Sequence, residues 1–289
     1  MGRIIDRRMA ALSYREAWQR ANAALTPLPY ANAAEEVRLI LAHLLGCALR
    51  DLPLMQDKTV DEAALTALLT RRAQGEPLQY ILGETEFMGL PYRCDRRALI
   101  PRGDTERLVE AALTHLTALA APKVADIGCG SGAIAVAVAH YCPRADVWAA
   151  DISAEALSLT RENAQLNNVA ITTCCGDLCE PLYDHAPFDM VISNPPYISI
   201  AEMEQLVDAS VQDYEPRNAL TDEGDGLLYY RRLAQEARAL VRPGGWLALE
   251  HGHTQSQAVQ ALLTEAGWRI TEIIRDWGGH DRAVIAEKQ

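Results

Sequence analysis

The sequence lacks three features that would indicate a class of protein at first reading. It has no cysteines spaced CxxC, no apolar run of the roughly eighteen residues that cross a membrane, and no excess of basic residues. No apolar core of signal-peptide length follows the charged residues 1–8. We therefore expect a cytoplasmic protein without a membrane segment.

The cysteines and histidines do not form a recognisable metal-binding pattern. The cysteines fall mostly within apolar runs, which predicts buried free thiols in a reducing compartment. Their positions are Cys47, Cys94, Cys129, Cys142, Cys174, Cys175 and Cys179. His251 and His253 flank Gly252, but two histidines without a spaced third ligand make a poor zinc site. We assign no metal.

Acidic residues outnumber basic ones, with 39 Asp and Glu against 27 Lys and Arg and a net charge of −12. A protein that binds along a nucleic acid needs a basic face to neutralise phosphates. The balance therefore argues against broad binding to nucleic acid, although it allows a local basic patch. With 289 residues and 49% hydrophobic composition, the chain can build one large α/β domain and a smaller one.

The first third of the chain predicts a helical domain and a linker. Apolar residues recur at spacings of three and four through residues 1–73, which predicts a small helical bundle. It carries no catalytic constellation, so a scaffold and a partner-docking module are equal alternatives. Residues 74–101 are rich in Gly and Pro, with short extended pieces at 80–82 and 87–92, and predict a β-hairpin linker.

Residues 102–289 predict a second, larger domain. It opens with a helix that Asp104 or Thr105 can cap. Strands are predicted at 123–127, 146–150, 171–175, 188–193, 246–250, 269–277 and 283–286, with helices at 133–140, 154–167, 227–241 and 256–266. This alternation predicts an α/β fold with a mostly parallel, doubly wound sheet, to which the last hairpin adds an antiparallel strand.

The stretch Asn194-Pro195-Pro196-Tyr197 follows one of these apolar strands. Two consecutive prolines cannot extend a strand ladder, so the strand must end here. Open α/β sheets bind ligands at this carboxyl edge. The amide of Asn194 and the carbonyl of Pro195 could hold a planar amino group, whereas the alternative is a plain turn.

A glycine-rich turn lies between the first strand of this domain and the helix after it. Its residues are Asp126, Ile127, Gly128, Cys129, Gly130, Ser131 and Gly132. The glycines allow backbone and ligand to approach closely. The next strand ends in Asp151, placed to accept from both ribose hydroxyls of an adenosine, and the third ends in Asp177, placed to accept from an adenine amino group. Together these features predict a nucleoside site.

Two cofactors are compatible with such a site. A nicotinamide dehydrogenase requires GxGxxG and phosphate contacts, whereas S-adenosylmethionine has no phosphates and tolerates the tighter GxGxG turn found here. The second alternative fits better. Combined with the stretch 194–197, it predicts methyl transfer to a planar amino or amide nitrogen.

These motifs resemble the PrmC/HemK family, the protein-(glutamine-N5) methyltransferases of peptide-chain release factors. The resemblance covers nearly the whole chain. It includes residues 83–87, 100–102, 104–106, 126–135, 193–198, 214–217, 243–245 and 250–252. It implies a seven-stranded, Rossmann-like class I S-adenosylmethionine-dependent methyltransferase domain, joined by a hairpin to an N-terminal helical domain. Gly103 departs from the pattern, because the family usually has proline there.

The resemblance also implies roles for individual residues. Residues 128–132 would line the methionine and ribose part of S-adenosylmethionine, Asp151 would hold the ribose, and Asp177 with Leu178 would flank the adenine. Asn194 to Tyr197, including Pro195 and Pro196, would bind the glutamine of the Gly-Gly-Gln tip of class 1 release factors. The segment 214–217 would form a loop near the active site.

The proposed chemistry requires orientation more than proton abstraction, since an amide nitrogen is a poor nucleophile. Acceptors on Asn194 and Pro195 would hold both N–H bonds and stabilise the partly positive nitrogen, while Tyr197 would exclude water. The alternative enzyme is an adenine-N6 DNA methyltransferase, which grips a flipped base with the same four residues. The acidic charge argues against it. A non-enzymatic module that binds the cofactor is the third alternative.

Overall fold

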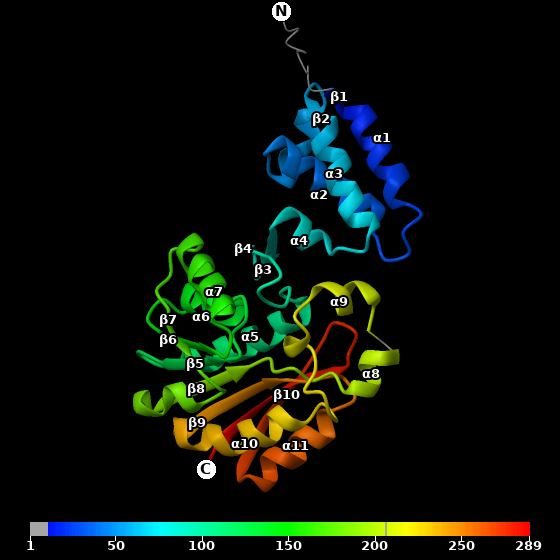
Figure 1. Cartoon of the computed structure of the whole chain (residues 1–289). Helices are drawn as coiled ribbons and strands as arrows, with labels where there is room; N and C mark the ends of the chain where they lie inside the picture. Colours follow the sequence, from blue (N-terminus) through cyan, green and yellow to red (C-terminus); the bar gives the residue numbers. More distant parts are fainter. Residues whose placement is uncertain (1–10, 206) are drawn as a thin grey trace, which may run out of the picture. The chain divides into compact units, whose positions relative to one another are not determined.

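The computed structural model describes residues 11–205 and 207–289, and the chain divides into two compact units, Met1–Gly83 and Glu84–Gln289 (Figure 1). The charged segment 1–8, considered above for a signal peptide, lies outside the described residues. Each unit has its own buried core. In the described part of the chain, no helix is long and apolar enough to span a bilayer.

The first unit is a small helical bundle. Its elements are β1 (Ala11–Ser13), α1 (Tyr14–Leu25), α2 (Ala33–Leu45), the 3-10 helix η1 (Leu49–Met55), β2 (Thr59–Asp61), α3 (Glu62–Ala73) and α4 (Leu78–Leu82). Ser13 and Glu16 form a capping box at the start of α1, and Asp61 caps α3. Gly46 ends α2 in the left-handed conformation. The described residues confirm the predicted helical pattern.

The prediction of an extended piece at residues 80–82 is wrong. These residues form α4, which begins after Pro77 and ends at Gly83. Gly83 has φ 75°, and its N–H donates to the carbonyl of Gln79 at 2.8 Å, which closes the turn as a helix C-cap. The hairpin itself lies further along, formed by β3 (Glu84–Phe87) and β4 (Leu90–Arg93).

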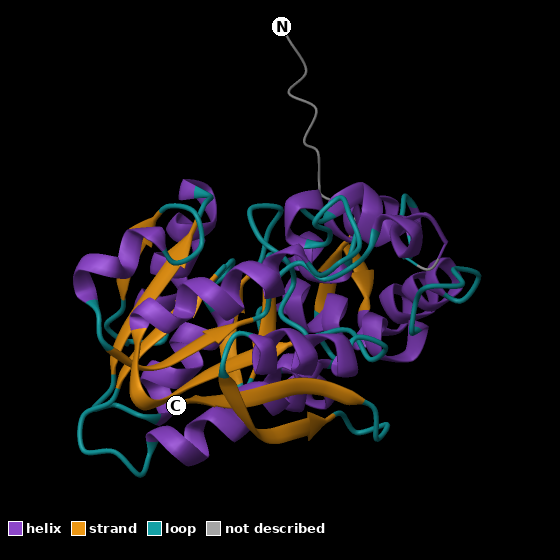
Figure 2. Cartoon of the chain, turned by 90° about the horizontal axis from the view of Figure 1, so that it is seen from below, coloured by secondary structure: helices purple, strands orange, loops and turns teal. Residues whose placement is uncertain are grey.

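The second unit is built on a seven-stranded sheet of order β10-β11-β9-β8-β5-β6-β7. Figure 2 draws the strands in orange with helices packed against them. Its strands are β5 (Lys123–Ile127), β6 (Asp146–Asp151), β7 (Thr172–Cys175), β8 (Phe188–Ser193), β9 (Val241–Glu250), β10 (Trp268–Arg275) and β11 (Asp281–Lys288). Strands β9, β8, β5, β6 and β7 pair in parallel, whereas β11 is antiparallel to both neighbours. The predicted mostly parallel sheet with an antiparallel hairpin is confirmed.

Helices cover both faces of this sheet (Figure 1). The helices of this unit are α5 (Gly103–Leu116), α6 (Ala133–Tyr141), α7 (Ala154–Leu166), η2 (Glu180–His185), α8 (Ile200–Gln205), α9 (Ala209–Tyr214), η3 (Arg217–Ala219), α10 (Leu228–Leu240) and α11 (Ser256–Glu265). Residues 190–192 of β8 alternate between the two cores: Met190 and Ile192 lie in the core that includes α5 and α6, and Val191 lies in the core that includes α10 and α11. The register shifts between Phe188 and Met190, and Phe188 lies in the same core as Val191.

The cysteines are all free, and four of the seven are buried. The prediction of buried thiols is wrong for Cys175, whose side chain is exposed at the end of β7, and Cys47 and Cys174 are half-buried. The strand β7 lies at the edge of the sheet, so an apolar run there does not guarantee burial.

The predicted cap of α5 is also wrong. The helix begins at Gly103, one residue before Asp104, and the residue at its N-cap position, Arg102, makes no side-chain cap. The hydroxyl of Thr105 instead accepts a hydrogen bond from Asn194, and Asp104 pairs with Arg282 at 3.4 Å. Asp104 and Thr105 therefore contact residues of the sheet edge, Arg282 and Asn194, and do not cap the helix.

Replacement of Gly103 by proline should stabilise the protein. Gly103 is the first helical residue, where proline is tolerated, and Arg102 before it has the extended φ −108° and ψ 142° that a residue preceding proline prefers. An added Cβ meets nothing within 4 Å. We expect the free energy of unfolding to rise by about 0.4–1 kcal/mol. Thermal denaturation of Gly103→Pro beside Gly103→Ala checks this, and a lowered melting temperature for the proline variant alone would contradict it.

Candidate active site

The carboxyl ends of the parallel strands meet at one edge of the sheet. The register pairs Ile127 with Ala150 and with Ser193, and Ser193 with Leu249, so the turns that follow these strands start at one level. A cavity of about 400 Å³ opens at this edge, within the second unit. Its size suits a small-molecule ligand.

Most of the candidate residues line this cavity. The sequence-predicted residues on its wall are Gly128, Cys129, Gly130, Ser131, Asp151, Asp177, Leu178, Asn194 and Pro196. The structure thus brings together the ends of four strands that are up to 66 residues apart in the sequence, as the hydrogen bond from Ser193 Oγ to the Ile127 carbonyl shows at 2.7 Å.

Four candidates lie behind the wall instead of on it. Asp126 and Gly132 support the glycine turn from below, Pro195 is buried, and Tyr197 packs against the sheet core on the α10 side. Burial raises the pKa of the Tyr197 phenol well above its usual value. The backbone carbonyl of Tyr197 accepts from Gln255 Nε2 at 2.8 Å, which ties the stretch 194–197 to the loop after β9.

The three glycines of the turn have positive φ angles, which residues with a Cβ adopt only with strain. Gly128, Gly130 and Gly132 have φ values of 69°, 54° and 78°. A Cβ at Gly132 would lie 2.7 Å from Cγ2 of Thr160, so this position also requires the small residue. At Gly128 the space is open, which leaves the backbone accessible to a ligand in the cavity.

Asp151 contacts the glycine turn directly. Its Oδ2 accepts from the Gly130 N–H at 2.8 Å and its Oδ1 accepts from the Ser153 N–H at 2.8 Å. Each carboxylate oxygen has a further lone pair, so the group can accept from a ligand while it holds the turn. The position is half-buried on the cavity wall.

Asp177 differs from the expectation in its surroundings. Its carboxylate forms an ion pair with Arg232 of α10, with the Arg232 nitrogens at 2.9 and 3.1 Å from the two oxygens. An adenine amino group that donates to Asp177 would therefore share this carboxylate with the guanidinium of Arg232. Leu178 beside it has φ 45° and is an apolar part of the wall.

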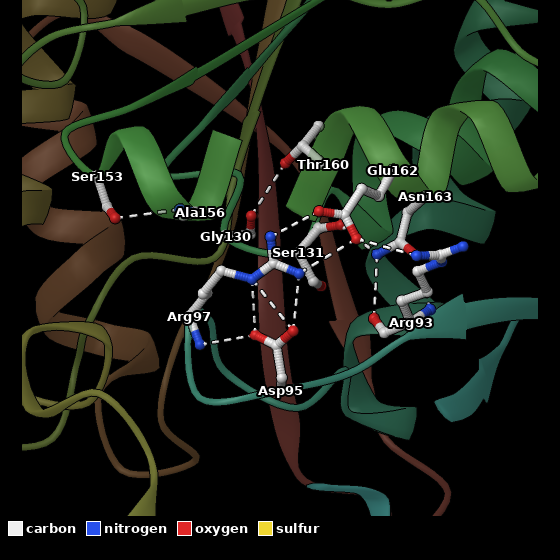
Figure 3. A network of polar contacts seen from close by, with 10 residues as sticks. All are labelled: Arg93, Asp95, Arg97, Gly130, Ser131, Ser153, Ala156, Thr160, Glu162 and Asn163. Carbon is white, nitrogen blue, oxygen red and sulfur yellow. Dashed lines mark hydrogen bonds and ion pairs between the residues drawn. The ribbon is translucent and has the colours of Figure 1, made fainter. Parts of the chain in front are cut away.

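A network of polar contacts holds the turn against α7 (Figure 3). Asn163 Nδ2 donates to the Ser131 carbonyl at 2.9 Å and to the Arg93 carbonyl at 3.2 Å, while its Oδ1 accepts from the Arg93 N–H at 2.7 Å. Thr160 Oγ1 donates to the Gly130 carbonyl at 2.9 Å. Arg97 bridges Asp95 and Glu162. The turn is therefore fixed on the side away from the cavity.

Replacement of Asn163 by leucine should destabilise the protein, because Asn163 is fully buried and its partners would be left unpaired. The cost of an unsatisfied buried polar group is about 1–3 kcal/mol. Thermal denaturation should show a melting temperature lower by several degrees, at roughly 2–4 °C for each kcal/mol. Gln165→Ala on the exposed face of α7 is the matched control. Equal melting temperatures for the two variants would show that the network does not stabilise the turn.

Asp126 lies directly beneath the glycine turn and is 1% exposed. Its Oδ2 accepts from the Ala135 N–H at 3.1 Å, and its Oδ1 has no hydrogen-bond partner among the described residues. Burial, opposed by the hydrogen bond from the Ala135 N–H and assisted by the nearby charge of Asp151, raises the pKa of Asp126 to about 7.

Asn194 lies at the other side of the cavity, with its Nδ2 3.1 Å from Thr105 Oγ1. Glu250, the last residue of β9, is 1% exposed and lies beside both residues. Burial raises the pKa of Glu250 to about 7, against the lowering effect of hydrogen bonding from Thr105 and Asn194. The sequence predicts only a helix cap for Thr105 and no role for Glu250, although both fall within motifs that carry the family resemblance.

The segment 214–217 closes one side of the cavity. Glu215 is buried, and its Oε2 accepts from the Ile100 N–H at 3.1 Å while its Oε1 pairs with Arg102. Ile100, Arg102 and Pro216 all line the cavity. The loop implied by the resemblance thus lies at the site, held to the segment before α5 by an ion pair.

The histidines do not form a joint site. His251 is buried, with Nδ1 2.9 Å from the Gly252 carbonyl, and burial lowers its pKa. His253 is exposed and meets the ring of His280 edge to face, with the ring centroids 5.8 Å apart. Within residues 11–205 and 207–289, no three His, Cys, Asp or Glu side chains are grouped as metal ligands.

Comparison with known proteins first defines the class. Residues 107–240 match the family model of the methyltransferase small domain, and residues 16–83 match that of the PrmC N-terminal domain. A T. thermophilus 16S rRNA N2 G1207 methyltransferase, solved with AdoMet and guanosine, shares the fold with a TM-score of 0.50 at 19% identity, covering 71% of this chain and 50% of that chain. The second unit is therefore a class I methyltransferase domain.

Comparison with individual curated proteins then defines the family. The release factor glutamine methyltransferase of Bordetella pertussis is 44% identical over 250 residues, which cover 86% of this chain and 92% of the relative. That of Geobacter sulfurreducens is 41% identical over 256 residues, covering 88% and 89%. The chain belongs to the release factor glutamine methyltransferase family, which confirms the resemblance seen in the sequence.

Proposed function

We propose that the protein transfers a methyl group from S-adenosylmethionine to the side-chain amide nitrogen (N5) of the glutamine in the Gly-Gly-Gln motif of class 1 release factors. One observation carries this proposal: Asn194 lies on the wall of the same cavity as the glycine turn and Asp151. A cofactor held by the turn and an amide held by Asn194 would meet in one enclosed space. The family supports the choice of acceptor.

The cofactor side fits S-adenosylmethionine. Gly128 leaves its backbone open to the cavity, Asp151 offers free lone pairs to the ribose, and Leu178 offers an apolar surface to the adenine. Asp177, paired with Arg232, would lie at the adenine edge. When bound, S-adenosylmethionine supplies a methyl group already activated by the sulfonium. The GxGxG spacing of the turn favours it over a dinucleotide, which requires GxGxxG.

The acceptor side orients an amide. Asn194 Oδ1 would accept one N–H of the substrate glutamine, and the Pro195 carbonyl would accept the other. Both acceptors stabilise the positive charge that develops on nitrogen during transfer. Tyr197, partly buried behind Asn194, would exclude water, and Pro196 would shape the wall. None of these groups needs to remove a proton before transfer.

The proposed partner is a protein, and the reaction would take place in the cytoplasm, where release factors act. The net charge of −12 does not suit a long contact with duplex DNA. The adenine-N6 DNA methyltransferase remains the competing function, because the stretch 194–197 could grip an exocyclic amine in the same way.

The test is incubation of the protein with labelled S-adenosylmethionine and either a purified release factor or duplex DNA. We expect one methyl group on the glutamine of the release factor, located by mass spectrometry of its peptides. A release factor with that glutamine replaced by glutamate is the matched control and should remain unlabelled. Labelling of DNA at a comparable rate, with none on the release factor, would favour the competing function.

A further inference from the structure

The orientation of the Asn194 amide decides which of its two ends faces the substrate. An amide group has an acceptor oxygen on one side and two donor N–H bonds on the other. The proposed mechanism needs the oxygen toward the substrate, since the nitrogen to be methylated carries hydrogens itself. If the Asn194 amide were flipped, its N–H bonds would face the N–H bonds of the substrate amide, and the two groups would repel each other.

The surroundings of Asn194 favour one orientation. Its Nδ2 donates to Thr105 Oγ1 at 3.1 Å, and its Oδ1 receives no hydrogen bond from any residue that the structure describes. Thr105 is 5% exposed, so its hydroxyl is fixed by protein contacts instead of solvent. When the Thr105 hydroxyl donates its hydrogen to Glu250, its oxygen can still accept from Asn194 Nδ2. An ionised Glu250 only accepts, so it sets the direction of both bonds.

We propose that Thr105 and Glu250 are positioning residues, which hold the Asn194 amide with Oδ1 toward the substrate. The proposal rests on the function given above and adds two residues to it. Thr105 contacts Asn194 from the first turn of α5. Glu250 interacts with both residues from the end of β9, where the pairing of Ser193 with Leu249 places it level with Asn194. Three separate elements thus converge on one amide.

The charge of Glu250 completes the arrangement. A protonated carboxyl would become a donor and would compete for Thr105 Oγ1 or Asn194 Oδ1. The groups that face Glu250 are the charged Asp104 and Arg282 and the phenols of Tyr197 and Tyr230. Asp104 and burial favour the protonated form, whereas Arg282 favours the ionised form. The ionised carboxylate is therefore the form that orients the amide, and the orientation should improve as pH rises through the pKa of Glu250.

The first test compares Thr105→Val with Thr105→Ser in methylation of a release factor. Valine keeps the shape but removes the hydroxyl, whereas serine keeps the hydroxyl. We expect kcat to fall about tenfold for valine and to stay within about threefold of wild type for serine. The KM for release factor and the affinity for S-adenosylmethionine should change less than kcat in both variants. Circular dichroism confirms that each variant is folded.

The second test asks whether Thr105 acts through Asn194. In an Asn194→Ala background, Thr105→Val should lower the single-turnover rate by less than about threefold, because the group that it orients is gone. Glu250→Gln should lower kcat and remove the rise of kcat with pH near 7, measured at saturating S-adenosylmethionine.

The outcomes separate this inference from the function on which it rests. A wild-type protein that does not methylate release factor would overturn both. Active wild type with equal kcat for the valine and serine variants would overturn the role of Thr105 alone, as would losses that multiply in the double variant. An unchanged kcat and pH profile in Glu250→Gln would overturn the role of Glu250.

Discussion

Replacement of Asn194 by alanine is expected to lower turnover by about 10²–10³ while cofactor affinity changes much less. The loss is of the size caused by removing one preorganised group that meets developing charge in a transition state. Asn194 lies at the end of β8, and the glycine turn and Asp151 are held by other contacts, chiefly those of Asn163 and Thr160. The cofactor side of the cavity should therefore keep its structure.

The measurement is single-turnover methylation of release factor, paired with calorimetric binding of S-adenosylmethionine on the same preparations. Asn194→Asp keeps an acceptor but loses the N–H donors to Thr105 and adds a charge, so partial activity at best is expected. Gln165→Ala removes an exposed amide on α7 and should behave as wild type. A rate for Asn194→Ala within about threefold of wild type, under 1 kcal/mol, would show that Asn194 does not orient the acceptor.

The sheet could be predicted because each of its strands leaves a local signal. Apolar runs that end in Gly, Asp or Asn-Pro-Pro mark a buried strand followed by a turn, and the strand at Lys123–Ile127 is observed with the predicted bounds. The alternation of strands and helices then leaves few topologies. The motifs that follow these strands lie at one edge of the sheet for the same reason, since parallel strands bring their carboxyl ends together.

The predictions for residues 80–82 and for Thr105 are wrong because contacts formed in the folded protein outweigh local sequence preference. Residues 80–82 contain β-prone Tyr and Ile, yet Gly83 closes them into a helical turn. Thr105 has the side chain of a helix cap, but Asn194, 89 residues away, uses it instead. Such pairings depend on which side chains the fold brings together, so they cannot be predicted from local propensity.

The same limit explains the supporting residues of the site. Glu250 follows an apolar strand and reads as an ordinary strand end, and only the fold shows it buried beside Asn194. The pairing of Asp177 with Arg232 joins positions 55 residues apart and changes what that carboxylate can accept. Most of the residues that line the cavity could thus be predicted from strand ends, whereas the buried side chains beside them could not.

Replacement of Asp151 by alanine is expected to weaken binding of S-adenosylmethionine tenfold or more. Hydrogen bonds to a charged group contribute about 1.5–3 kcal/mol each, and every 1.4 kcal/mol is about a factor of ten in affinity. The structure adds a second cause, because Asp151 also accepts from the Gly130 N–H at 2.8 Å and so holds the turn that lies against the cofactor.

Titration calorimetry of Asp151→Ala against Asp146→Ala is the sharpest form of this measurement, since Asp146 is an exposed carboxylate at the opposite end of the same strand, β6. Asp146→Ala removes the same charge from the protein without touching the cavity, and its affinity should equal that of wild type. Asp151→Asn should lie between, because its single oxygen can still accept from a backbone N–H but the negative charge is lost. Thermal denaturation without cofactor shows whether the turn itself has loosened. If Asp151→Ala binds S-adenosylmethionine as tightly as Asp146→Ala does, Asp151 neither holds the ribose nor shapes the turn for it, and the cofactor must lie elsewhere in the cavity.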